Sequence, residues 1–463
     1  MTLRRALASA ALAVTCAAAQ DAARPDPDAD AAATIKGGDV DLARSVRAVG
    51  DRIAAIVGRG RAPGLVAVRA DEATRDAEVA ARAQQLLPSA VAAARGRAWR
   101  DIGFGSGTEP KDLVVAIEQD VPGMTFDAAR SRLLVDPKRL LPASGHGNPD
   151  EDPDASILLT TGVAPDEPVA GHYVAHALLD GPSLDGPVTT DALLARSALA
   201  EGSANLAALV LLFGGVGLEP EVVSGTLRPE DALGGRLVSE TMRSASPVTA
   251  SLLEFIYLDG FAQSASLARK GGFSRLAQER KSRRTTRDVL HLDRAPTPAV
   301  EILEPSLPRS LELSPADRDS LGEQGIVSLV SLLTGKDNLG LIAGDGWAAD
   351  ALWRFEPGLG SKAGTGEAGA TVWVTRWTTD EDADDFAYAL ERCLQARFPG
   401  EALQDDVQRG GRVLVRVDRA YRIERSGLQV ALRVVPSAID AKMGLDAKKK
   451  RAAPPSAPAK KLK

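Results

Sequence analysis

Hydrophobic side chains recur at a helical spacing near the start of the chain. Between residues 39 and 97, apolar positions follow one another at intervals of three or four: Leu42, Val46, Val49, Ile53 and Ile56. This spacing places them on one face of a helix, and Pro88 interrupts the pattern. We therefore expect a helical N-terminal region over residues 39–120.

The middle of the chain combines a short hairpin with longer helices. Residues 123–137 carry apolar side chains on both sides of an Ala-Arg-Ser turn, which predicts two paired strands. Apolar periodicity predicts helices over residues 167–180, 190–213, 248–270 and 320–334. These elements form the expected core over residues 121–335.

The pattern changes to strands and one helix toward the C-terminus. A strand is expected from Val372 to Trp377, and a helix over residues 380–398 begins with acids in its first turn. Residues 413–418 and 428–435 are expected to be paired strands. The fold class is therefore predicted to be α+β without internal repeats, with a C-terminal α/β region over residues 336–437.

The first residues have the pattern of an export signal. Residues 1–19 contain two arginines, an apolar run and an Ala-x-Ala site, so cleavage after Ala19 is expected. Residues 20–38 would then form a flexible leader. We expect an exported protein, in the periplasm, the cell envelope or the medium. A lipoprotein anchored through Cys16 is the less favoured alternative. With Cys16 removed, Cys393 would be a free thiol.

Composition and charge restrict the classes of molecule that the protein could bind. Hydrophobic residues make up 44% of the chain and aromatic residues only 4%, and the net charge is -6. These values argue against specific nucleic-acid binding, which needs a basic face or aromatic stacking. A basic tail over residues 438–463 is expected to be disordered, and either contacts an anionic envelope surface or only aids solubility. The sequence makes no prediction of an oligomeric state.

Two of the four histidines stand four residues apart in a predicted helix. His172 and His176 would share one helix face, so both imidazoles could reach the same metal ion. Glu201 follows on the next predicted helix, and two histidines with such a carboxylate form a known catalytic zinc geometry. Zinc is thus the expected cofactor. The alternative is a pair of partly buried histidines, with Glu201 as their partner or as an ordinary carboxylate on the helix face.

The motif and several later segments resemble the gluzincin type of exported bacterial zinc metallopeptidase. The family's motif helix is similar to H-E-L-T-H-A-L-Q-D-Q, and its second helix carries Glu-Gly-x-Ala, as residues 201–204 do here. Further similar segments, in the family's order, are residues 123–135, 255–261, 271–273, 285–291, 345–350 and 377–383. The resemblance covers roughly residues 95–435 and implies a zincin-like helical core with a small hairpin layer.

One residue departs from the family motif, because Tyr173 follows His172 where the family has Glu. In HExxH proteins this Glu accepts the proton from zinc-bound water and returns it to the leaving amine. A tyrosine, with an unperturbed pKa near ~10, cannot do so at neutral pH. The departure predicts impaired peptidase chemistry with retained metal ligands. We interpret Tyr173 as an apolar filler, with a compensating acid as the alternative.

Three other polar residues allow two interpretations each. Asp180 either orients one of the motif histidines or ends its helix before Gly181 and Pro182. His291 and Tyr257 stand where the resembling family keeps a polar residue, which makes them weak catalytic candidates. Either could equally be a core residue with satisfied hydrogen bonds.

Three functions fit these observations. The leading hypothesis is an exported pseudopeptidase that keeps its zinc ligands and binds a protein or peptide partner. The second is an active zinc-dependent hydrolase in which another group replaces the missing general base. The third is a metal-free scaffold or binding protein of the cell envelope.

Overall fold

The chain forms two units, each with its own core. The computed structural model describes residues 40–58, 66–105, 108–119, 124–127, 132–136, 166–179, 188–212, 245–282, 284–296, 298, 300–307, 312–357, 369–406 and 411–437. Unit 1 comprises Met1–Ser89 and Thr108–Thr297, and unit 2 comprises Ala90–Gly107 and Pro298–Lys463. The expected ranges differ from this division, because residues 90–107 belong with the C-terminal unit and the expected boundary at residue 335 falls inside unit 2.

Unit 1 is mainly helical. In chain order its helices are α2 (Val40–Ile56), α3 (Glu72–Leu86), α5 (Pro110–Gln119), α8 (Asp166–Leu179), α9 (Thr190–Leu212), α12 (Pro247–Glu254), the π-helical turn η2 (Phe255–Asp259), α13 (Gly260–Ser282) and α14 (Thr286–Leu290). The prediction of one helix over residues 248–270 needs correction, since α12, η2 and the first part of α13 occupy it. Its predicted end is confirmed, because the backbone leaves the helical conformation at Gly271 and Gly272 before α13 resumes.

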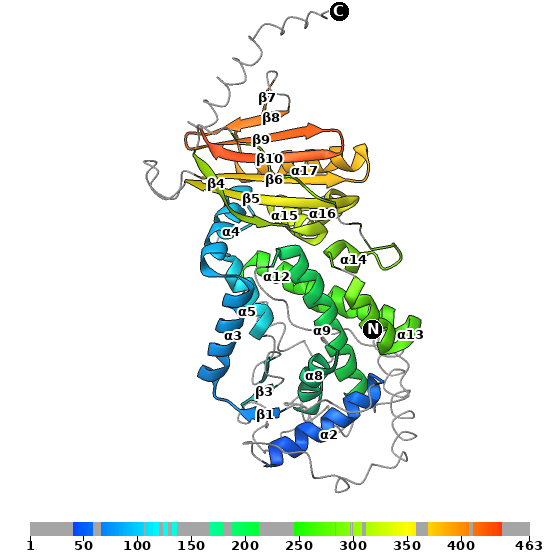
Figure 1. The fold of residues 1–463 in the computed structure, drawn as a ribbon. Coiled ribbons are helices and arrows are strands. Elements are labelled where there is room, and N and C mark those ends of the chain that lie inside the picture. Colours follow the sequence, from blue (N-terminus) through cyan, green and yellow to red (C-terminus); the bar gives the residue numbers. More distant parts are fainter. Residues whose placement is uncertain are drawn as a thin grey trace, which may run out of the picture. The chain divides into compact units, whose positions relative to one another are not determined.

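Helix α9 runs through the middle of this unit (Figure 1). Nearly all of its side chains are buried, which is typical of a helix surrounded by other elements. Its main neighbours are α8, α13 and η2. At its start, the buried Asp191 accepts hydrogen bonds from the backbone N–H of Thr286 at 2.8 Å and from the Thr286 hydroxyl at 2.7 Å. These bonds connect α9 to α14.

A small sheet completes unit 1. Its order is β1–β3–β2, with β1 at Val66–Arg69, β2 at Met124–Asp127 and β3 at Arg132–Val135. The antiparallel pair of β2 and β3 confirms the predicted hairpin. Strand β1 pairs in parallel with β3 and was not predicted. The N-terminal region is therefore not wholly helical. Strand β1 has four residues, as β2 and β3 do, but its partner β3 is distant in sequence, so no hairpin pattern marks it.

Unit 2 contains a seven-stranded antiparallel sheet. Its order is β4–β5–β6–β10–β9–β8–β7. The strands are β4 (Leu313–Asp319), β5 (Trp347–Pro357), β6 (Ala370–Trp377), β7 (Gln404–Asp405), β8 (Arg412–Val415), β9 (Arg419–Ser426) and β10 (Gln429–Pro436). Its helices are α4 (Ser89–Ile102), α15 (Gly322–Thr334), α16 (Asp337–Gly344) and α17 (Asp380–Arg397). The prediction of an α+β protein is confirmed.

The predicted pairing of residues 413–418 with 428–435 is wrong, because β9 lies between these strands and pairs with both. The sequence of β9, Arg-Ala-Tyr-Arg-Ile-Glu-Arg-Ser, is rich in charge and was not predicted as a strand. Its arginines are accommodated by acidic partners. Arg422 pairs with Asp406, and Arg425 Nε lies 3.0 Å from an Asp384 oxygen.

Both faces of the large sheet are covered. On one face, Trp373 and Trp377 pack against Phe386 of α17. On the other, Trp353 and Val372 belong to a buried cluster that includes Ile302 from the segment before β4. The alternation along β6 thus directs its large side chains into two separate apolar layers.

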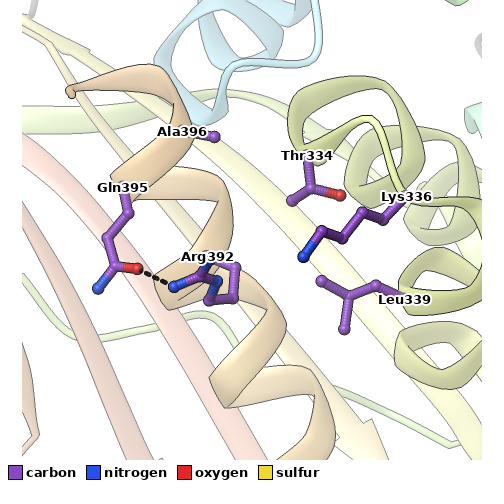
Figure 2. A pocket seen from close by; sticks show the side chains of 6 residues that line it. All are labelled: Thr334, Lys336, Leu339, Arg392, Gln395 and Ala396. Atoms are coloured by element: carbon purple, nitrogen blue, oxygen red, sulfur yellow. Dashed lines mark hydrogen bonds between the residues drawn. The ribbon is translucent and has the colours of Figure 1, made fainter.

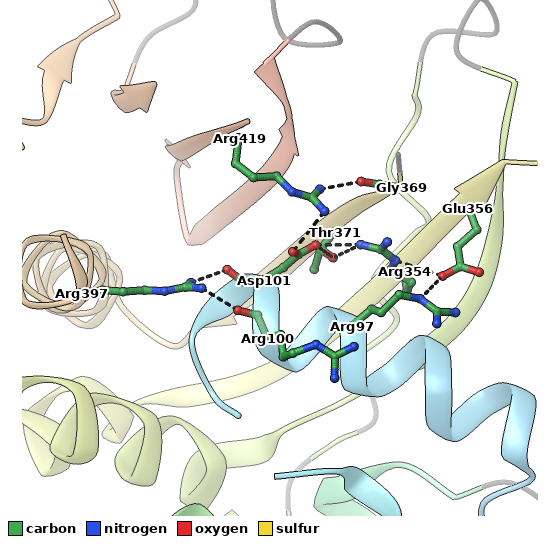
Figure 3. Close-up of polar contacts among 9 residues, drawn as sticks. All are labelled: Arg97, Arg100, Asp101, Arg354, Glu356, Gly369, Thr371, Arg397 and Arg419. Atoms are coloured by element: carbon green, nitrogen blue, oxygen red, sulfur yellow. Dashed lines mark hydrogen bonds and ion pairs between the residues drawn. The ribbon is translucent and has the colours of Figure 1, made fainter. Parts of the chain in front are cut away.

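Helix α4 is tied to the sheet by charged groups around Asp101 (Figure 3). One Asp101 oxygen accepts hydrogen bonds from Arg354 Nη1 and the Thr371 hydroxyl, each at 2.7 Å. The other lies 3.6 Å from Arg419 Nη2. Arg397 of α17 donates to the carbonyls of Arg100 and Asp101 at 2.8 and 2.7 Å, where the helix ends. Two carbonyls in the last turn of α4 and both oxygens of the half-buried Asp101 carboxylate therefore have donors nearby.

Another buried acid, Asp350, stabilises the start of α15. It accepts hydrogen bonds from the backbone N–H groups of Leu321 and Gly322 at 2.9 and 3.1 Å, and from Trp373 Nε1 at 2.9 Å. Burial raises the Asp350 pKa, although these bonds act in the opposite direction. A strand residue thus provides the cap that Leu321, at the helix start, cannot supply.

Several sequence-based expectations fall on residues that the structure does not describe. These are the export signal, the leader and the basic tail. Within the described residues, no helix has the length and apolar character needed to cross a membrane.

Candidate metal site

The two motif histidines lie one turn apart on α8, and Glu201 lies on the neighbouring helix α9. The expected pairing of the two helices is present, and the three side chains converge. All three are buried, with exposed fractions of 3% for His172 and 7% for His176 and Glu201. Three polar groups that are distant in sequence thus meet inside a helical core.

The separations between their ligand atoms fit a single small cation. The Nε2 atoms of His172 and His176 are 3.1 Å apart. The Oε2 atom of Glu201 lies 3.3 Å from His172 Nε2, and its Oε1 atom lies 3.3 Å from His176 Nε2. Two ligands of a tetrahedral zinc ion, each with a bond of about 2.1 Å, stand about 3.4 Å apart. The two imidazole nitrogens and the two carboxylate oxygens therefore stand at separations that ligands of one such ion have, and one ligand atom from each residue lies within 4.8 Å of the others.

The hydrogen-bonding pattern of the cluster is incomplete. Among the described residues, Glu201 Oε2 is buried and has no hydrogen bond of acceptable geometry, although His172 Nε2 is near it. A buried carboxylate oxygen normally has a donor or a cation as its partner. The cluster of His172, His176 and Glu201 could hold a metal ion, and a cation among these three atoms would satisfy the carboxylate.

The charge state of Glu201 suits a metal ligand. Burial raises the pKa of its carboxyl, but His176 and His172 outweigh this effect and hold the pKa well below its usual range. The carboxyl therefore stays ionised at neutral pH, as metal coordination requires.

Glycine residues allow the helices around Glu201 to pack closely. A Cβ atom on Gly202 would stand 2.1 Å from the carbonyl oxygen of Gly260, where α13 begins. A Cβ atom on Gly260 would stand 2.2 Å from the carbonyl oxygen of Ala198. Only glycine fits at these two positions, and the close contact fixes the turn of α9 that carries Glu201.

Tyr173 packs against the histidines. It is 4% exposed, and its ring centroid lies 5.1 Å from that of His172 in an edge-to-face arrangement and 6.2 Å from that of His176. Its aromatic ring occupies buried space beside both imidazoles. This position agrees with the interpretation of Tyr173 as a buried filler.

The remaining sequence candidates lie elsewhere or cannot be placed. Asp180 lies outside the described residues. His291 is a half-buried residue at the C-terminal cap of α14, and it is not one of the clustered groups. Tyr257 is buried in the π-helical turn η2, which packs against α9. His291 therefore does not extend the His172–His176–Glu201 cluster.

A fourth ionisable residue near the cluster was missed by the sequence analysis. Glu118, on α5, is close enough for the charges of His176 and Glu201 to affect its carboxyl. Burial raises its pKa to about 7, and Glu201 adds to the increase, while Arg82 and His176 oppose it. No motif marks Glu118, because it stands far upstream of His172 in an ordinary amphipathic segment.

Unit 2 has a surface hollow between α15, α16 and α17 (Figure 2). It is lined by Thr334, Lys336, Leu339, Arg392, Gln395 and Ala396. Arg392 Nη1 donates a hydrogen bond to Gln395 Oε1 at 2.8 Å on the same helix. All six lining residues are half-buried or exposed, so the hollow lacks the buried convergent polar groups of a specific ligand site.

Comparison with known proteins gives one match, in unit 2. A family described as a domain of unknown function (DUF8575) matches residues 311–443. The match covers the seven-stranded sheet and its helices α15 to α17, and it does not include the cluster of His172, His176 and Glu201. No curated protein and no solved structure matches the chain.

Proposed function

We propose that this chain is a zincin-like protein that holds one zinc ion through His172, His176 and Glu201, and that its peptidase chemistry is impaired. The observation that carries the proposal is the buried triangle of ligand atoms, which all lie within 4.8 Å of one another. Two imidazoles and a carboxylate are a donor set that zinc commonly takes, with a fourth position left open.

The expected impairment comes from Tyr173. A zinc ion in such a site lowers the pKa of a bound water and polarises a carbonyl. The buried phenol ring beside both imidazoles supplies no carboxylate to take up a proton. Loss of a positioned general base typically reduces the rate by ~10²- to 10⁴-fold. Binding of a protein or peptide partner is then the better-supported role.

Metal analysis of the purified protein tests this proposal. We expect one zinc ion per chain in the wild type and almost none in His176→Ala. His291→Ala is the matched control, because it removes a half-buried histidine outside the cluster. Equal zinc content in all three proteins, or none in the wild type after growth with zinc, would contradict the proposal.

We also propose that the protein is exported, because the charged start, the apolar run and the Ala-x-Ala site have the pattern of a signal peptide. N-terminal sequencing of the mature protein should begin at Gln20. A mature form that begins with a lipidated Cys16 would instead indicate membrane anchoring.

A further inference from the structure

Part of unit 1 carries a strong concentration of positive charge. Residues 269–288, from the middle of α13 into α14, contain eight Lys or Arg and two acids, which gives this basic stretch a charge of +6. The whole chain carries -6, so all other residues together carry -12. The basic stretch therefore has the opposite sign to the chain as a whole, and such an asymmetry creates a local field that attracts anionic partners.

Most of the basic stretch is an amphipathic helix. The backbone of α13 leaves the helical conformation at residues 271–272, and the segment that follows packs through the buried Phe273 and Leu276. The exposed positions on the other side of this segment are residues 274, 275, 278, 281 and 282. Figure 1 shows α13 and α14 beside the central helix α9. Arg275 and Lys281 therefore stand on the solvent side of the helix.

The two acids of the basic stretch have local partners. Glu279 is buried and pairs with Arg275 one turn away on the same helix. Asp288 is also buried, and it accepts hydrogen bonds from two backbone N–H groups at 3.1 and 3.2 Å, at the start of α14. Three basic side chains of the stretch are exposed and form no ion pair with the part of the chain that the structure describes: Lys270, Lys281 and Arg284.

We propose that the basic stretch binds the anionic headgroups of a phospholipid bilayer. Lys and Arg side chains close to such a surface are attracted to it by charge. Among the described residues of α13, no large hydrophobic side chain is exposed, so the helix adsorbs to the headgroups and does not insert. This contact needs neither a metal ion nor peptidase chemistry, and it goes beyond the proposed function.

Two observations favour a bilayer over a nucleic acid as the partner. Phe273 is the one aromatic residue of the basic stretch, and it is buried, so no ring is available to stack on bases. The pattern of residues 1–19, on which the proposed export rests, directs a chain to a membrane and across it. The exported form would therefore meet anionic headgroups, and the choice of this partner rests on that proposal.

Co-sedimentation of the full-length protein with lipid vesicles tests this inference. One set of vesicles contains phosphatidylcholine alone, and the other also contains phosphatidylglycerol, whose headgroup is anionic. The wild type should bind the anionic vesicles more tightly, and its binding should weaken as salt is added. A variant that combines Lys270→Gln, Lys281→Gln and Arg284→Gln should bind them about 10²-fold more weakly, because each basic residue near an anionic surface contributes to binding.

A control variant separates the local charge of α13 from the total charge of the protein. It combines Arg318→Gln, Lys336→Gln and Arg392→Gln, which removes the same charge from exposed positions in unit 2. This control should bind like the wild type. An equal loss in both variants, or no loss in the α13 variant, overturns the inference.

Two further outcomes also contradict the assignment to a bilayer. Equal binding of the wild type to both sets of vesicles would show that anionic headgroups are not recognised. Tighter binding to duplex DNA than to anionic vesicles at the same salt concentration would assign the basic stretch to a nucleic acid. Neither outcome bears on the zinc site, whose metal content is measured separately.

Discussion

Two buried polar clusters, one in each unit, differ in how their charges are satisfied. In unit 2, both oxygens of Asp101 face donors, from Arg354, Thr371 and Arg419. In unit 1, Glu201 has one buried oxygen without a well-formed hydrogen bond among the described residues. Its neighbours are two imidazoles whose Nε2 atoms face each other.

By this difference, the Asp101 cluster is a structural network, whereas the Glu201 cluster could hold a metal ion. Buried charges that are fully paired connect elements of the fold, as Asp101 connects α4 with the sheet. Buried groups that converge on one point, with a carboxylate oxygen that has no well-formed hydrogen bond among the described residues, could hold a metal ion. The first cluster should therefore stabilise unit 2 without a cofactor, and the second should require a cation for full stability.

The largest expected effect on folding free energy concerns the Asp101 cluster of unit 2. Asp101→Ala leaves Arg354, whose side chain is 1% exposed, without its main carboxylate partner. Breaking a buried ion pair typically costs about 3–5 kcal/mol of folding free energy. All five tryptophans lie in unit 2, so their fluorescence during urea unfolding reports on this unit. The loss of folding free energy should be the same with and without zinc. A loss that depends on zinc would contradict the view that the Asp101 cluster needs no cofactor.

The next effect concerns chemistry at the His172–His176–Glu201 cluster. Tyr173→Glu would place a carboxylate beside the proposed metal, and general-base assistance is worth about 10²-fold or more. Repacking around the smaller side chain would reduce this gain. Hydrolysis of casein or a fluorescent peptide library should increase above the wild-type level.

Two control variants test whether a gain in activity depends on the new carboxylate and on the metal ligands. Tyr173→Gln has the same shape as the Glu variant but cannot accept the proton, and Tyr173→Glu combined with His172→Ala removes a ligand. Neither should gain activity. Strong zinc-dependent proteolysis by the wild type would contradict the impaired-peptidase proposal. An inactive but zinc-loaded Tyr173→Glu would show that other parts of the catalytic machinery are absent.

A smaller effect is expected from the helix contact that positions Glu201. In Gly202→Ala, the new Cβ would overlap the Gly260 carbonyl oxygen and push α9 and α13 apart. Such overpacking typically costs about 1–3 kcal/mol, and a displaced ligand should weaken zinc affinity about 10-fold. Gly260→Ala should act similarly. Titration with zinc in a competing chelator measures both, and unchanged affinity would show that the contact does not position Glu201.

The last effect is a pH dependence that comes from Glu118, whose side chain is 26% exposed, so solvent screening reduces its size. Its pKa is raised in the folded, metal-free protein, from 4.5 to about 7. The folded state therefore holds this proton more tightly than the unfolded state. The resulting stabilisation is present below about pH 4.5 and is lost as the pH increases to about 7. One pKa unit corresponds to about 1.4 kcal/mol.

Unfolding of the metal-stripped protein, followed by circular dichroism at several pH values, measures this dependence. In Glu118→Gln, the folding stability should no longer decline between these pH limits. Glu78→Gln, the control that replaces another acid of unit 1, should still show the decline. An unchanged decline in Glu118→Gln would assign the effect to other groups.

The sequence predicted those features that depend on local patterns. Helix α17 has an apolar face and a capping box at its start, and the hairpin of β2 and β3 surrounds a polar turn. The helices that carry His172, His176 and Glu201 are apolar on most sides, and Gly181 and Gly214 in the sequence mark where they end. The approach of the two histidines follows from helix geometry alone. Their convergence with Glu201 was predicted because two histidines and a carboxylate from the next helix form a known zinc geometry, and because residues 201–204 resemble the Glu-Gly-x-Ala segment of the gluzincin family.

Other features depend on long-range contacts that no local pattern contains. Strand β9 is charged, and it is stabilised by partners such as Asp406 and Asp384. The assignment of α4 to unit 2 depends on Asp101 and its arginines. The charges of His176 and Glu201 act on Glu118, although Glu118 stands far upstream of both in the chain. Sequence spacing carries no information about these contacts.

Zinc-edge X-ray absorption of the stripped and reconstituted protein tests the central claim most directly. We predict a first shell of nitrogen and oxygen atoms at about 2.0–2.1 Å with two imidazole rings, and one imidazole fewer in any zinc that remains with His176→Ala. A sulfur shell near ~2.3 Å would place the metal on a cysteine. That result, or a spectrum unchanged by His176→Ala, would contradict the assignment of zinc to His172, His176 and Glu201.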